Sequence, residues 1–574
     1  MNHKKKIAIL LFLIILFGSF LRLYKLDKFP PCLFGDEVDV GYQAYSILKT
    51  GKDYMGQRWP ISFHSLADWR TPLFLYTTVP FVAIFGLNEW GVRLPAAFFG
   101  IITLPIFFLL IRKLFKNDDL ALLGTFFLSI SMWHLQYSRA AFEVTQMLSL
   151  IITGVYFFLK GQGKWQFLLL SAIFLGLAPY SYNTAKFFIP IFVLFLIVLF
   201  WERLQKISLK RLLLVIFVFG LISAPMTWDI FFGEATDRFS ILSIFTDPTV
   251  VPQIGFDRQV DMRVSIGKDV PVGAVPSFSS RIFHNKFLFW GISLLQNYFK
   301  VFSTDFLFVR GDVNFRHSIQ GGFGQLYWLD IIFLLLGLYF MVRYKNSKIK
   351  RLILGWLLLA PIPSTLTRDG GNHATRLILI LPPLLILITF GIYKFLEKFK
   401  KINQKIIACC LLFTVYCFLF ILYLHRYYVH YPLESEEWWH YGFKELAEYV
   451  KENELKYDYI VFSDRDQPPL IFSLFWLKIE PKIFQENKLE WVQISDAIWA
   501  DHLPNTKYYY GHVLEERITA NGFIGTLKPT ILYLMPKLEI AKDFRYEPVP
   551  NSIKLLKTIY YPSGRIAKYI LSGL

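Results

Sequence analysis

Three carboxylates stand close together near the start of the chain, at Asp36, Glu37 and Asp39. They follow a long apolar run that begins at Ile7, so they stand soon after a predicted membrane span. An ionised carboxylate is costly near a low-dielectric surface unless it is paired, hydrated or metal-bound, which favours a functional role. Residues 40–48 have helical spacing, and the alternative is that these acids only stabilise the start of a helix.

Other charged and polar residues are expected on the same side of the membrane, in outer loops or at the outer ends of spans. They are Asp68, Arg70, Arg139, Glu143, Lys186, Arg368, His373 and Arg376. Arginine can hold two phosphate oxygens with parallel hydrogen bonds, and lysine acts as a point charge. Such a mixed cluster suits an anionic lipid headgroup beside a catalytic carboxylate. For any single basic residue, an interfacial anchor or a structural ion pair is an equal alternative.

One long outer loop, residues 229–326, contains His317 and the run Gly321-Gly322-Phe323-Gly324. This run lacks the preceding strand and the following helix of a nucleotide-binding loop. We interpret it as a flexible loop over the membrane face that could act as a lid. His317 and His373 are far apart in the chain, which favours solvated loop histidines. These residues identify no particular cofactor and leave a divalent metal open.

Long apolar helices must position these residues, because 54% of the 574 residues are hydrophobic and they gather in long runs. A membrane span needs about 20 apolar residues, so the pattern predicts about eleven spans. They are expected near residues 7–24, 91–112, 119–136, 143–160, 165–181, 185–202, 211–228, 327–344, 351–367, 376–394 and 405–425. The run from Leu73 to Leu87 is shorter and contains Pro80, which predicts an interfacial or re-entrant helix instead.

The basic residues predict the orientation. They gather in short blocks between the apolar runs, and such blocks stay on the cytoplasmic side. The blocks are residues 4–6, 112–116, 160–164, 203–211, 343–351 and 394–405. The N-terminus is therefore predicted to be cytoplasmic, and residues 25–90 and the C-terminal tail extracytoplasmic. The same pattern accounts for the net charge of +18, so nucleic acid is not an expected partner.

The tail changes in composition and predicts a small α/β domain. Residues 435–452 have helical spacing, and residues 459–462 and 530–534 are predicted strands. Residues 553–570 are predicted to form a hairpin. We predict two domains, a transmembrane catalytic domain at 1–428 and an extracytoplasmic α/β domain at 429–574.

The order of these features resembles the GT-C superfamily of membrane glycosyltransferases. A basic N-terminus and one span precede Asp36-Glu37, which lie in a loop with interfacial helices. Further matching motifs are Arg70-Thr71-Pro72-Leu73, Arg93-Leu94-Pro95, Tyr137-Ser138-Arg139 and His373-Ala374-Thr375-Arg376. The chain is similar to bacterial enzymes related to the protein O-mannosyltransferases and the lipid A aminoarabinose transferase. The resemblance covers roughly residues 5–425.

The resemblance implies a glycosyltransferase of the plasma membrane. The donor would be a sugar on a polyprenyl phosphate, the acceptor a lipid, glycan or protein, and the transfer inverting. By the same resemblance, Asp36 is the candidate general base or acceptor-orienting residue, Glu37 its neighbour in the site and Glu143 the candidate second acid. The implied ligands of the donor phosphate are Arg376, Arg70, Lys186, His373 and Arg139.

The alternative is a transporter or flippase of lipid-linked glycans. Transporters carry ionisable residues or broken helices near the middle of the membrane. Here the charges gather at the ends of spans on one face, which favours an enzyme.

Overall fold

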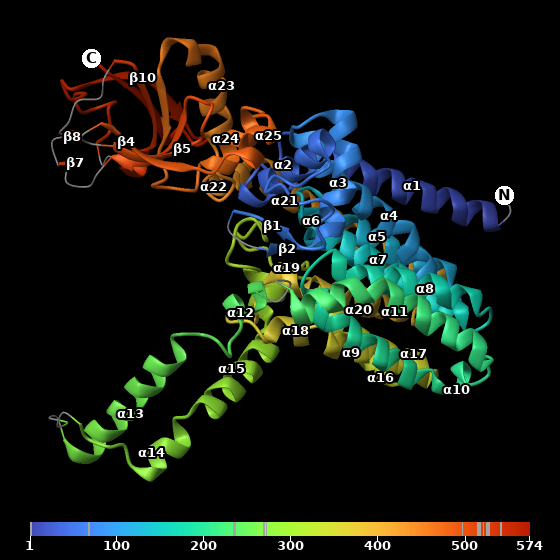
Figure 1. Ribbon diagram of the computed structural model, residues 1–574. Coiled ribbons are helices and arrows are strands. Elements are labelled where there is room, and N and C mark those ends of the chain that lie inside the picture. The colour runs from blue at the N-terminus through green and yellow to red at the C-terminus, as the bar shows by residue number, and fades with distance from the viewer. Residues whose placement is uncertain are drawn as a thin grey trace.

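A bundle of apolar helices carries a sheet domain at one end in the computed structural model of the chain (Figure 1). The structure describes residues 3–66, 69–233, 237–267, 270, 273–495, 498–513, 518–519, 522–523, 529–539 and 542–574. Asp68, one of the polar residues singled out above, lies outside these ranges. The N-terminus lies at the end of the bundle far from the sheet domain (Figure 1).

Six helical segments among the described residues are long and apolar enough to cross a membrane, so the chain is a multi-pass membrane protein. They are α1 (His3–Leu23), α4 (Glu89–Phe115), α7 (Val144–Gly161), α11 (Leu209–Phe232), Ala374–Glu397 and Ile402–Glu434. Ala374–Glu397 comprises α19 (Ala374–Leu377), η3 (Ile378–Ile380) and α20 (Leu381–Glu397). Ile402–Glu434 comprises α21 (Ile402–His425), η4 (Arg426–His430) and α22 (Tyr431–Glu434). The apolar part of Ala374–Glu397 is buried within the protein, whereas few residues of α11 are buried, as expected of a central and a lipid-facing helix.

The other five expected spans are also helical, but they are shorter or interrupted. They are α5 (Asp118–Ile130) with α6 (Met132–Ser138), α8 (Gln166–Leu177) with η1 (Ala178–Tyr180), α9 (Thr184–Leu199) with α10 (Trp201–Leu204), α16 (Asp330–Val342), and α17 (Ser347–Leu359) with α18 (Ile362–Thr365). One break has a clear cause. The backbone of Ser131 is extended and its hydroxyl accepts from the His134 N–H, which starts a new helix.

The first outer loop contains the two helices that the sequence predicts, α2 (Gly35–Thr50) and α3 (Pro72–Phe85). Asp36 and Glu37 lie in the first turn of α2, where the helix dipole favours negative charge. Between the helices, β1 (Phe63–His64) pairs antiparallel with β2 (Trp69–Arg70). This short pairing places Arg70 near the start of α2.

An arm of short helices projects from the bundle (Figure 1). It contains α12 (Asp237–Leu242), α13 (Val250–Ile266), α14 (Phe278–Phe283) and α15 (Lys286–Lys300). After η2 (Asp305–Val309), the glycine run is packed rather than free. Phe323 is buried, and a Cβ on Gly324 would lie 2.4 Å from the backbone nitrogen of Phe308. The expectation of a flexible lid here is therefore wrong, because this close backbone approach fixes the run in place.

The tail forms a seven-stranded sheet in the order β10-β11-β9-β3-β6-β5-β4. The strands are β3 (Tyr459–Phe462), β4 (Glu490–Ser495), β5 (Ile498–His502), β6 (Tyr508–Val513), β9 (Ile531–Pro536), β10 (Ile553–Tyr560) and β11 (Ile566–Gly573). A separate pair joins β7 (Ile518–Thr519) to β8 (Gly522–Phe523). The helical elements are α23 (Phe443–Asn453), η5 (Glu454–Lys456), α24 (Leu470–Trp476), α25 (Pro481–Glu486) and η7 (Lys537–Glu539). The predicted strands and the hairpin of β10 with β11 are confirmed.

The sheet domain packs on the first outer loop. The Tyr42 hydroxyl donates to the Ile479 carbonyl at 3.0 Å, and the Gln485 amide donates to the Ser46 hydroxyl at 2.9 Å. The backbone N–H of Gly35 donates to Nδ1 of His440 at 3.2 Å. The first loop and the tail therefore lie at the same end of the bundle.

Candidate functional site

A cavity of about 560 Å³ opens at the start of α2, between the first outer loop and the tail. Asp36, Asp39 and Arg70 line it from the first loop. Trp438 and His440 line it from the segment after the last apolar helix. The cavity is thus built from both ends of the chain.

Arg70 lies among three carboxylates in this cavity. Its guanidinium contacts Asp36 at 2.7 Å, Asp39 at 2.6 Å and Glu143 at 3.2 Å. Asp39 is buried, whereas the Asp36 side chain is 53% exposed. The cluster carries an excess of negative charge, and Asp36 is its accessible member. Arg70 was expected to bind the donor phosphate, but the structure has it hold the acids together.

Glu37 points away from the cavity. Its carboxylate accepts two hydrogen bonds from Arg93, at 2.9 and 3.0 Å, and one from the Ala141 N–H at 2.9 Å. Glu37 and Arg93 are both fully buried. Successive residues of a helix project about 100° apart, so Asp36 and Glu37 face different surroundings. The expected place of Glu37 beside Asp36 in the site is therefore corrected.

Arg139 was expected to bind the donor phosphate, but its side chain makes structural contacts within the protein. It is buried, and it donates to the carbonyls of Leu21 at 2.6 Å and Tyr24 at 2.8 Å and to the Tyr427 hydroxyl at 3.1 Å. These bonds satisfy carbonyls at the end of α1 that have no partner within the helix. Arg139 joins α1 to η4 instead of facing a ligand.

Two of the expected phosphate ligands, Lys186 and Arg376, line a second and smaller cavity of about 90 Å³. The Arg376 guanidinium donates to the Thr367 hydroxyl at 2.7 Å and to Asp369 at 2.5 Å. These contacts fix the guanidinium at the wall of the cavity. Lysine and arginine together make this wall suitable for an anion.

The two cavities are close neighbours through Ser181. The hydroxyl of Thr71, which follows Arg70, donates to the Ser181 carbonyl at 2.9 Å. The Ser181 hydroxyl donates to the backbone carbonyl of Glu143 at 3.3 Å. The next residue, Tyr182, lines the smaller cavity. An acidic pocket and a basic pocket therefore lie on the two sides of one short segment.

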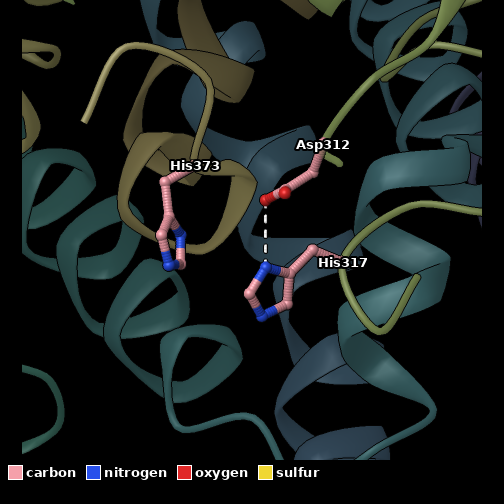
Figure 2. A group of neighbouring side chains, drawn as sticks. All are labelled: Asp312, His317 and His373. Atoms are coloured by element: carbon pink, nitrogen blue, oxygen red, sulfur yellow. Dashed lines mark hydrogen bonds and ion pairs between the residues drawn. The ribbon is translucent and has the colours of Figure 1, made fainter. Parts of the chain in front are cut away.

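His373 lies beside His317, with their ring centroids 4.8 Å apart (Figure 2). Nδ1 of His317 donates to Oδ2 of Asp312 at 2.9 Å. These three are the one group among the described residues that could hold a metal ion. Burial alone would raise the pKa of the Asp312 carboxyl, but the His317 hydrogen bond and the charges of both imidazoles lower that pKa overall. The expectation of two separate, solvated histidines is wrong, because the fold brings loop 310–317 against the start of α19.

The contact of His440 with the first outer loop should make the stability of the fold depend on pH. Burial and the charge of Arg316 lower the pKa of His440 from 6.5 to about 4. Its Nδ1 accepts from Gly35, so the folded state needs the neutral ring. The depressed pKa stabilises the fold above pH 6.5, and up to about 3 kcal/mol is lost as the pH falls from 6.5 towards 4.

We expect the melting temperature of the protein to fall over this pH window. In His440→Gln, whose amide oxygen can still accept a hydrogen bond, the fall should be smaller. An equally steep fall in the variant would show that other groups cause it.

Sequence reasoning missed the part of the site that lies after the last apolar helix. The run Glu436-Glu437-Trp438-Trp439-His440 was a signal. It puts acids and aromatic rings directly at the outer end of a span, much as Asp36 stands after the first one.

The sequence of part of the chain is similar to known proteins, and the fold of nearly the whole chain is similar to solved structures. The profile of the family described as dolichyl-phosphate-mannose-protein mannosyltransferase matches residues 69–228. The dolichyl-phosphooligosaccharide-protein glycotransferase 2 of Pyrococcus furiosus is 29% identical over 150 residues, 24% of this chain and 19% of that protein. The match thus spans about a fifth of the relative's length.

Two solved structures extend the comparison. AglB, the archaeal oligosaccharyltransferase of Archaeoglobus fulgidus, aligns with a TM-score of 0.46 and 15% identity, over 83% of this chain and 64% of its own. ArnT of Cupriavidus metallidurans, bound to undecaprenyl phosphate, aligns with a TM-score of 0.52 and 12% identity, over 99% of this chain and 98% of its own. The chain has the fold of the GT-C membrane glycosyltransferases. The resemblance inferred from the sequence is confirmed at this level.

Within this GT-C fold, the segment that matches the mannosyltransferase profile contains residues of both cavities. It runs from β2 to α11 and includes Arg70, Glu143 and Lys186. Asp36 and Arg376 lie outside it, and the fold brings them to the same place.

Proposed function

We propose that the protein is a glycosyltransferase that takes a sugar from a polyprenyl phosphate and passes it to a hydroxyl-bearing acceptor. One observation carries the proposal. An exposed carboxylate, Asp36, lines one cavity, and Lys186 and Arg376 line another directly beside it. Inverting transfer from a lipid phosphate needs a base on one side of the sugar and an anion site on the other.

The donor phosphate is assigned to the smaller cavity. Lys186 and Arg376 would neutralise the charge that develops on the phosphate as the sugar leaves. The match to ArnT supports this class of donor, because ArnT is bound to undecaprenyl phosphate. The profile match to a dolichyl-phosphate-mannose-dependent family supports it also.

The reaction proceeds in one displacement. The acceptor oxygen forms a bond to the anomeric carbon of the sugar while the bond from that carbon to the phosphate oxygen breaks. The Asp36 carboxylate takes the proton of the acceptor hydroxyl, and the lipid phosphate leaves with the electron pair. Arg70, held by Asp39 and Glu143, orients Asp36 through their ion pair.

The acceptor is assigned to the larger cavity, between α2 and the tail. Arg316 lies over the Phe34 ring at 4.8 Å and near the Trp438 ring at 5.8 Å. Aromatic rings and an arginine beside open carboxylates suit the faces and hydroxyls of a sugar-like or peptide acceptor. A lipid, glycan or protein acceptor would reach Asp36 from this side.

The predicted topology forms part of the proposal. The shared cavity requires the first loop and the tail to face the same compartment. With a cytoplasmic N-terminus, that compartment is the outside of the plasma membrane, where the domain of residues 429–574 would receive the acceptor. A divalent metal is kept as a further partner, since Asp312, His317 and His373 offer ligands beside the proposed phosphate site.

The activity can be tested with purified protein in detergent, a polyprenyl-phosphate sugar and a membrane extract. Glycosyl transfer should release free polyprenyl phosphate and label an acceptor. A flippase would instead carry the labelled lipid across a vesicle bilayer without breaking the bond, and that result would overturn the proposal.

The basic cavity gives a prediction on donor use. Lys186→Ala and Arg376→Ala should each weaken binding of polyprenyl phosphate at least tenfold, because each removes one charged partner of a desolvated phosphate. Binding is measured by displacement of a labelled polyprenyl phosphate. Lys444→Ala, which removes a lysine paired with Glu89, is the matched control. Unchanged binding in both cavity variants would move the donor phosphate elsewhere.

A further inference from the structure

The cluster of Asp312, His317 and His373 lies outside both cavities and has no part in the transfer step. We propose that it binds one divalent transition-metal ion of the zinc class. A carboxylate oxygen of Asp312 and one nitrogen from each imidazole would be the ligands. The candidate ligand atoms all lie within 4.8 Å of one another. Figure 2 shows the carboxylate pointing towards the two rings.

The chemistry of the donors selects the class of ion. Imidazole nitrogen suits zinc and its neighbours, whereas magnesium and calcium prefer oxygen ligands. Three protein ligands leave one coordination position open. Around zinc, ligand atoms about 2 Å from the ion lie about 3.3 Å apart. The most distant ligand atoms would therefore have to approach by up to about 1.5 Å, whereas the distance from Asp312 to His317 is already 2.9 Å.

The ligands are fixed before an ion arrives. Oδ2 of Asp312 accepts from the Ala374 N–H at 2.8 Å, and Oδ1 accepts from the Asn314 N–H at 2.9 Å. The His317 ring packs to one side of the rings of Tyr137 and Phe142, with centroids 6.1 and 5.8 Å away. This preorganisation lowers the entropy that binding costs. His317 would bind the metal as a neutral ring: if Nδ1 coordinates, its proton moves to Nε2 by exchange with solvent, and no net proton is lost.

The position of the site suggests a structural role for the ion. His373 immediately precedes α19, the helix that carries Arg376. Asp312 and His317 belong to the loop that follows the projecting arm. An ion held between them would reinforce the hydrogen bond from Ala374 to Asp312 that already ties this loop to the start of α19, the helix that carries Arg376. The benefit for catalysis rests on the proposed function, whereas metal binding itself does not.

The test uses the full chain without a histidine tag, purified in detergent and stripped with a chelator. Zn²⁺ or Co²⁺ is added, unbound metal is removed by gel filtration, and bound metal is counted by mass spectrometry. We expect one ion per chain, visible absorption bands from bound Co²⁺ and a rise in melting temperature with Zn²⁺. An excess of Mg²⁺ should not displace the ion.

The variants separate this site from chance binding. His317→Ala and His373→Ala should weaken Zn²⁺ binding at least tenfold and abolish the rise in melting temperature. His430→Ala is the matched control, because His430 also faces a second histidine, His425, with ring centroids 5.2 Å apart. Wild-type folded protein that binds no ion would overturn the proposal, as would both cluster variants binding as the wild type does.

The outcome is independent of the transfer reaction. Metal is measured without donor or acceptor, and Asp36→Asn should bind the same amount as the wild type. Failure of metal binding would therefore leave the glycosyltransferase proposal standing. Loss of transfer in Asp36→Asn with normal metal content would leave the metal site standing.

Discussion

Replacing Asp36 by asparagine is expected to lower the rate of sugar transfer by about 10²- to 10⁴-fold, the usual contribution of a general base. Asparagine keeps the size of the side chain and can still accept a hydrogen bond from Arg70, so the fold should be unchanged. The measurement is the release of polyprenyl phosphate at saturating donor, together with the melting temperature of the variant.

Asp27→Asn is the matched control for this experiment. Asp27 is half-buried in the same outer loop, and it does not line the cavity. It should retain full transfer activity. Full activity in Asp36→Asn would remove Asp36 from the mechanism and leave the acidic cavity without its proposed role.

Glu37→Gln is expected to affect stability rather than chemistry. Breaking a fully buried ion pair costs about 3–5 kcal/mol, because the remaining charge has no partner. The glutamine oxygen could still accept one hydrogen bond from Arg93, and the bonds to the carbonyls of Leu26, Pro30 and Cys32 would remain, but the buried guanidinium would lose its counter-charge. The melting temperature should fall by several degrees. Protein that remains folded should still transfer sugar.

An exposed ion pair provides the control. Glu397→Gln removes a partner of Lys394 at 2.5 Å, in a pair that water screens. It should leave the melting temperature unchanged. If Glu37→Gln were as stable as the wild type but inactive, Glu37 would belong to the catalytic site after all. Asp36 and Glu37 would then both act in catalysis, although their side chains lie in different surroundings.

The sequence predicted most of the helical architecture because apolar runs of span length have few alternatives. It also placed Asp36, Lys186 and Arg376 on one face, since the basic loops fix which ends of the helices lie together. Some helices are interrupted within a continuous apolar run, as at Ser131. Such a break depends on one hydroxyl and leaves the apolar pattern unchanged, so the pattern does not predict it. Composition alone therefore could not show how many spans are continuous.

The roles of individual charged residues could not be predicted in the same way. Arg70, Arg139 and Arg376 have the same chemistry and similar expected positions, yet their partners differ. Three carboxylates surround Arg70, backbone carbonyls at the end of α1 hold Arg139, and Arg376 faces a cavity. These partners come from distant parts of the chain, and local spacing carries no information on them. The same holds for His317 and His373.

The bond from Gly35 to His440 joins a residue made early in synthesis to one made after all the apolar helices have been synthesised. Asp36 is therefore synthesised long before the residues that form the opposite wall of its cavity. Sugar donor that reached such an unfinished chain would meet an open acid with no acceptor in place. Under the proposed function, a chain that ends before Trp438 would lack this wall of the acceptor cavity, and we expect it to be inactive.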